Sequence, residues 1–100
     1  MTDSGKIDEL GRFDLEGDAD AAAATRCTVQ NDSRFKARVV FMAHRNGELW
    51  EHRVYIRPGQ TVTIACPLGQ VVVVVFNVET NSFHQGRVLR VGGPFTFVVN

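Results

Sequence analysis

A run of five consecutive valines, residues 71–75, restricts the fold of this 100-residue chain more than any other feature. Branched side chains favour strands, and Phe76 and Val78 prolong the apolar run. A strand in a small antiparallel sheet usually turns one face to water, so its apolar and polar residues alternate. Because this run does not alternate, we expect apolar side chains on both faces of the strand.

The remainder of the chain from residue 25 follows a period of two, which is typical of half-buried strands. Turn-forming residues separate the segments, among them Asn46-Gly47 and Pro58-Gly59. We expect strands at residues 25–31, 36–43, 49–56, 61–66, 71–79, 87–91 and 95–99, with a loop over 80–86. About seven short strands and little helix indicate an all-β fold, a small antiparallel β-sandwich that is immunoglobulin-like or related.

The first 24 residues differ from this body in charge. They hold seven acidic and two basic residues, a net charge of −5, whereas residues 25–100 hold nine basic and four acidic residues, a net charge of +5. We therefore divide the chain into a loosely structured acidic arm or linker, residues 1–24, and a β-sandwich domain, residues 25–100.

Residues that could carry out chemistry are few and widely spaced. The candidate metal ligands are His44, His52, His84, Cys27 and Cys66, and no pair of them has the spacing of a zinc or copper site. No nucleophile elbow or phosphate-binding loop is present in the sequence. We expect no metal, no cofactor and no enzyme activity. Cys27 and Cys66 are interpreted as buried free thiols, with a single disulfide as the alternative.

The chain has no basic segment followed by an apolar run at its start, and the run at 71–76 is too short to span a bilayer as a helix. We expect a cytoplasmic protein that does not bind membranes. The sequence pI near 6.8 and the acidic arm argue against a nucleic-acid partner.

The valine run also suggests where a partner binds. Taking Val72, Val74, Phe76 and Val78 as the core face leaves Val71, Val73 and Val75 pointing outward. On the strand at 36–43, Val40 and Met42 point outward as well. If the two strands are neighbours, these residues form a contiguous apolar patch, and such patches mark interaction sites. We expect a protein-interaction or self-assembly module, and hence a possible homo-oligomer. Alternatively, Phe13, Leu15 and the alanine run of the arm, or loop residues, cover the patch.

The body from about residue 31 to 100 resembles the β domain of the von Hippel–Lindau tumour suppressor family in layout. The matching features are Asn31, Ser33, Gly47, Pro58-Gly59, Ile64, Gly69 and the run from Val71. The resemblance implies a sandwich that presents a protein-binding face. The positions that would form that family's hydroxyproline pocket hold Arg53, Cys66, Gln70 and Val72, which do not match its aromatic, hydroxyl and imidazole pattern. No binding residue is therefore carried over.

A second possible function is carbohydrate binding. Sandwich lectins use amphipathic side chains, and Trp50, Tyr55, Asn81 and His84 are residues of this type. They would form the ligand-binding surface of a lectin-like module.

Overall fold

The computed structural model describes residues 6–7, 13–14 and 24–100. Two short strands, β1 (Lys6–Ile7) and β2 (Phe13–Asp14), pair with each other. The rest of the predicted arm, apart from Ala24, lies outside the described residues. The described part of the chain contains no helix.

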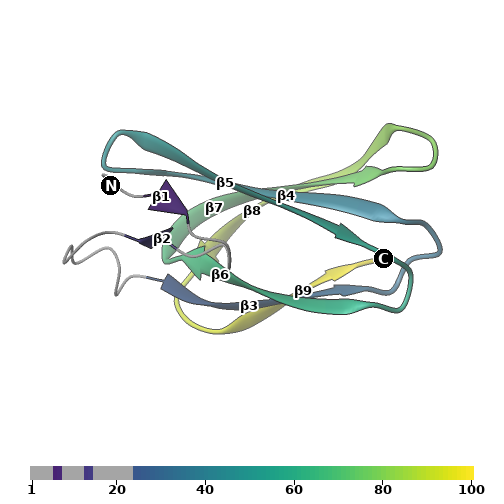
Figure 1. Ribbon diagram of the computed structural model, residues 1–100, viewed down its shortest axis with the longest axis horizontal. Helices are drawn as coiled ribbons and strands as arrows, with labels where there is room; N and C mark the ends of the chain where they lie inside the picture. The colour runs from purple at the N-terminus through teal and green to yellow at the C-terminus, as the bar shows by residue number, and fades with distance from the viewer. Residues whose placement is uncertain (1–5, 8–12, 15–23) are drawn as a thin grey trace.

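The seven longer strands form two stacked sheets, which confirms the predicted β-sandwich (Figure 1). One sheet has the order β5-β4-β7-β8 and the other β6-β3-β9. The strands are β3 (Ala24–Asn31), β4 (Ala37–Arg45), β5 (Glu48–Ile56), β6 (Thr61–Pro67), β7 (Gly69–Asn77), β8 (Ser82–Val91) and β9 (Phe95–Val99).

The connections are less simple than a meander. Two hairpins, β4–β5 and β7–β8, build the four-stranded sheet, and their turns lie at opposite ends of it (Figure 1). The other connections cross between the sheets, and β9 pairs with β3 in parallel. In the constant immunoglobulin domain the first, second, fourth and fifth strands share a sheet. Here, counting from β3, the first and fourth strands (β3 and β6) lie in one sheet, and the second and fifth (β4 and β7) lie in the other. The fold is therefore a related sandwich.

Positive backbone φ angles occur at the turns that the sequence predicts. Asn46 and Gly47 have φ of 53° and 79°, as a two-residue hairpin turn requires. Gly59 has φ of 81° at the second central position of the Pro58-Gly59 turn, and Gln60 N donates to Arg57 O at 3.0 Å.

The prediction of a loop over residues 80–86 was wrong for most of these residues. The turn ends at Asn81, and β8 begins at Ser82 and pairs with β7. Asn77 Oδ1 accepts hydrogen bonds from the backbone of Glu79 and Thr80, which closes the turn early. Polar residues are tolerated in β8 because it is an exposed edge strand.

The inward face of β7 is the reverse of the one predicted. Val71, Val73 and Val75 are 0% exposed and belong to the core between the sheets. Val72, Val74 and Phe76 are only partly buried and point away from it. Five identical side chains fit either face, and the register with β4 decides between them, since it sets Val73 opposite the core residue Phe41.

His52 lies half-buried on the inward face of β5, and its ring stacks on Trp50 at 6.2 Å between centroids. Burial lowers the pKa of His52 from its ordinary value of 6.5. As the pH falls through 6.5, the unfolded chain therefore binds the proton before the folded chain does. The contribution of neutral His52 to the free energy of unfolding is therefore complete above pH 6.5. It is lost as the pH falls from 6.5 towards the pKa of His52 in the folded chain.

We expect the melting temperature of the native protein to fall more between about pH 8 and about pH 5 than that of His52→Gln, which has no such group to titrate. Calorimetry of both proteins at matched ionic strength measures the difference. Equal pH dependence would show that His52 contributes nothing.

Candidate functional site

The outward face of the four-stranded sheet carries the large exposed hydrophobic side chains of the described residues. Their four large exposed apolar side chains, Val88 (67%), Phe83 (64%), Leu49 (56%) and Tyr55 (53%), all lie on this face. Between them, on β4 and β7, lie further apolar residues that also point outward. We call the whole set the outer patch: Val40, Met42, Leu49, Tyr55, Val72, Val74, Phe76, Phe83 and Val88.

The outward face of the three-stranded sheet differs sharply in composition. It consists of Arg26, Thr28, Gln30, Thr61, Thr63, Ala65, Thr96 and Val98. Threonine and other polar side chains suit a strand surface in contact with water. The two outer faces are thus chemically unequal, and the outer patch is a property of one sheet alone.

Polar groups surround the outer patch at defined positions. The Arg38 guanidinium carbon lies 4.4 Å from the centre of the Phe76 ring, and Phe76 meets Phe83 edge to face at 6.3 Å. On β5, Arg53 Nε donates to Glu51 Oε2 at 2.6 Å. The patch therefore has an aromatic end crossed by a cation, and an ion pair along its β5 edge.

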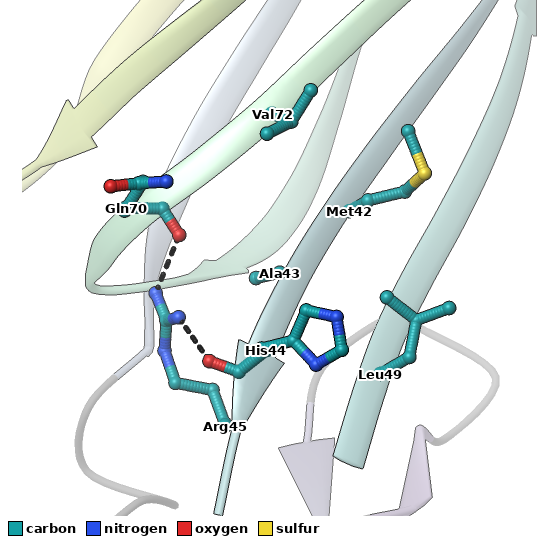
Figure 2. A pocket seen from close by; sticks show the side chains of 7 residues that line it. All are labelled: Met42, Ala43, His44, Arg45, Leu49, Gln70 and Val72. Atoms are coloured by element: carbon teal, nitrogen blue, oxygen red, sulfur yellow. Dashed lines mark hydrogen bonds between the residues drawn. The ribbon is translucent and has the colours of Figure 1, made fainter. Parts of the chain in front are cut away.

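A shallow pocket of about 440 Å³ opens at the other end of the outer patch (Figure 2). Its lining comprises Met42, Ala43, His44, Arg45, Leu49, Gln70 and Val72. The pairing of β4 with β7 ends at Met42 and Val72, and the pocket lies beside that point. The depression follows from the two strands separating.

Arg45 bridges the separated strands. Its Nη2 donates to the backbone oxygens of Leu68 and of Gln70, the latter at 3.1 Å, and its Nη1 donates to His44 O at 2.6 Å (Figure 2). A side chain at Gly69 would meet Nη2 at 3.0 Å, and Gly69 has φ of +98°. Arg45 and Gly69 together fix the β6–β7 turn beside the pocket.

The predicted partner-binding residues separate into two groups. Val71, Val73 and Val75 are core residues, so their predicted outward orientation was wrong. Val40 and Met42 do point outward, as predicted, although Val40 is only 8% exposed. The prediction from the sequence did not include the β8 residue Val88, because the position of Val88 beside β7 depends on the register of the hairpin.

The four residues proposed for carbohydrate binding do not share one surface. Trp50 is 1% exposed and lies in the core, so its ring offers no face for stacking on a sugar. Tyr55 is exposed on β5 at the edge of the outer patch. Asn81 lies in the β7–β8 turn, and His84 Nε2 bonds to Asn100 O at 2.8 Å.

Cys27 and Cys66 are buried and unbridged on the neighbouring strands β3 and β6. Cys27 is paired with Ile64, so Cys66 lies diagonally from it, at about 7–8 Å between α-carbons, which is too far for a disulfide. Burial raises the pKa of both thiols to about 12, and the neighbouring Cys66 adds to the effect on Cys27.

Both thiols should therefore be inert in the native protein. The thiolate is the reactive form, so we expect iodoacetamide labelling near pH 8 to be about 1000-fold slower than in denaturant. Mass spectrometry after timed quenching measures each site. A native rate equal to the denatured one at either cysteine would contradict the burial.

Within the described residues, no three His, Cys, Asp or Glu side chains gather where they could hold a metal ion. Nor does that part of the chain contain a helix long and apolar enough to cross a membrane.

The fold and its surface define a two-sheet β-sandwich with one apolar and one polar outer face. No family model, curated protein or solved structure matches this chain. The resemblance to the von Hippel–Lindau β domain stays a prediction from the sequence.

Proposed function

We propose that this chain is a non-catalytic protein-interaction or self-assembly module whose contact surface is the outer patch. One observation carries the proposal: the four large apolar side chains exposed among the described residues all lie on the same face of one sheet. Isolated apolar residues are ordinary on protein surfaces, but contiguous ones mark sites of association.

The free energy available on this face is substantial. Burying a Val, Leu or Phe side chain completely yields about 1.5–3 kcal/mol, and the four exposed residues retain more than half of their surface. Covering them would therefore yield about 4–7 kcal/mol per protomer. A gain of this size can contribute substantially to offsetting the entropy lost on association.

The outer patch also lacks the usual protection against unwanted association. Charged residues commonly interrupt exposed strand faces. On this face the central strands β4 and β7 carry one arginine, Arg38, whose guanidinium lies over the ring of Phe76. A partner can therefore exclude water from the centre of the patch without burying an unpaired carboxylate.

We expect Val88→Glu to abolish association and to reduce binding of a hydrophobic dye, because it places a charge on the outer patch. Thr96→Glu is the matched control, since Thr96 is exposed on the outward face of the other sheet. Sedimentation equilibrium and dye fluorescence of both variants and of the native chain measure the effect. A native chain that neither associates nor binds the dye would contradict the proposal.

A cytoplasmic location is part of the proposal. The two free thiols support it, because paired cysteines are the usual state in oxidising compartments.

A further inference from the structure

We infer that the occupant of the outer patch is the same patch of a second copy, packed face to face about a two-fold axis that runs across the strands. The inference rests on the proposed function and specifies its partner. It follows from the order of residues on the outward face of the four-stranded sheet.

Two rows of paired residues cross the middle of this face from β5 to β8. The first row is Glu51, Met42, Val72 and Val88, and the second is Arg53, Val40, Val74 and Gly86. Each row thus begins with a charge, continues with two apolar residues and ends on β8 with a valine or a glycine.

A two-fold axis lying between these rows and parallel to them sets the first row of one copy over the second row of the other. Glu51 then faces Arg53 of the second copy, and this contact occurs twice. Since Arg53 already bonds to Glu51 within its own chain at 2.6 Å, the four side chains would form one charge network. Such networks contribute more than isolated surface ion pairs.

The same operation matches the shapes of the β8 residues. Val88, the most exposed of the four large apolar side chains, faces Gly86 of the second copy. Gly86 leaves a notch beside the Phe83 ring, which lies 3.5 Å from where a β-carbon would stand. The valine methyl groups would enter this notch against the ring.

A two-fold axis parallel to the strands gives a poorer match for the two charges on β5. It would set β5 over β8 with the rows unchanged, so that Glu51 faced Val88 and Arg53 faced Gly86. Both charges would lose water without gaining an opposite charge from the second copy, which is unfavourable.

The size of the face predicts a weak dimer. Four strands are about 19 Å wide, and the six residue steps from Leu49 to Tyr55 span about 20 Å. The flat area is therefore about 400 Å² per protomer, or about 800 Å² for the pair, and side-chain relief increases the accessible area. Standard specific interfaces bury about 1,200–2,000 Å² in total, so this one falls in the class of weak or transient interfaces, and dimerisation should depend on concentration.

Exchanging the charges tests the arrangement. Glu51→Arg and Arg53→Glu should each weaken the dimer about tenfold or more, because like charges then face each other. Mixed in equal amounts, the two variants should form a heterodimer about as tight as the native dimer, because every facing pair is opposite again. Sedimentation equilibrium of each variant, the mixture and the native chain measures the dissociation constants.

Cross-linking tests the same axis independently. Leu49→Cys should react through a short bismaleimide with Tyr55→Cys when the two variants are mixed, and neither should cross-link alone, because the axis sets these positions opposite each other. Efficient cross-linking of Leu49→Cys to itself would overturn the arrangement, as would a mixture of charge variants that associates no better than either alone.

The outcomes separate this inference from the proposed function. If Val88→Glu dissociates the native assembly but charge exchange has no effect, self-assembly through the outer patch is supported and the proposed two-fold axis is wrong. A native chain that stays monomeric at all concentrations overturns the dimer. In that case, slow thiol labelling of Val88→Cys would assign the cover to this chain's own residues, and rapid labelling would leave the patch to a different protein.

Discussion

Val73→Asp is expected to unfold the protein. Val73 is 0% exposed, and its neighbours in the sheet are Phe41 on β4 and Arg87 on β8. A carboxyl group at this position replaces apolar contacts and must either lose its hydration or take up a proton. We expect a loss of at least about 4 kcal/mol, a large share of the stability of a domain this small. Circular dichroism during urea titration measures it.

The matched control is Val72→Asp, one residue away on the opposite face of the same strand. Val72 is partly exposed beside the pocket, so its replacement should cost about 1 kcal/mol and leave a cooperative unfolding transition. The reverse ranking, with Val72→Asp unfolded and Val73→Asp folded, would show that β7 presents the other face to the core.

Asn31→Ala is expected to have the second largest effect. Asn31, at the end of β3, is the buried polar residue of the described core. Its Nδ2 donates to the backbone oxygens of Phe35 and Ile56, each at 2.9 Å, and its Oδ1 accepts from Ser33 N at 2.9 Å and from Ser33 Oγ at 2.5 Å. One side chain thus joins the end of β3, the following loop and the end of β5.

Removing this amide takes the side-chain donor from Ile56 O, and it leaves Phe35 O with the bond from Ser33 Oγ at 3.1 Å. It also removes the acceptor of Ser33, and each buried polar group left without a partner costs about 1–3 kcal/mol. We expect Asn31→Ala to lower the free energy of unfolding by about 2–4 kcal/mol at an unchanged denaturant slope. Asn31→Asp keeps the acceptor and loses both donors, so it should be at least as damaging. Gln30→Ala is the control, because Gln30 bonds only to the side chain of Asp32 at the surface. Equal losses in the Ala variants at 30 and 31 would contradict the role of Asn31.

The strands and turns of this fold could be predicted because they depend on local signals. Positive φ at Gly47 and Gly59 follows from residue type, and alternation along β4 identifies the outward residues Val40 and Met42 correctly. The strand order could not be predicted, because it depends on which sheet each connection enters.

The predicted orientation of β7 was wrong because the polar residues at its two ends, Gln70 and Asn77, indicate opposite inward faces. Gln70 is exposed and has the same parity as Val72, which indicates an inward Val71. Asn77 has the opposite parity, but it ends the strand and its side chain closes the β7–β8 turn, so it says nothing about the core. The double-sided apolar character of the strand was predictable from five valines, whereas the face that remains uncovered was not.

The position of the outer patch depends on contacts that are distant in sequence. Phe83 and Val88 join it through the register of β8 on β7, which includes an irregularity beside Val75 and Phe76. No local pattern in β8 indicates that these residues share a face with Met42 and Val40. The apolar surface therefore becomes visible only when the four strands are assembled.

Thiol labelling at position 88 tests most directly whether the outer patch is a contact surface. Single Val88→Cys and Thr96→Cys variants carry a reactive group on either outer face, while the buried native thiols stay silent. We predict that the labelling rate at position 88 falls as native chain is added, and that the rate at position 96 does not change. Equal, concentration-independent rates at both positions would contradict association of this chain through the outer patch.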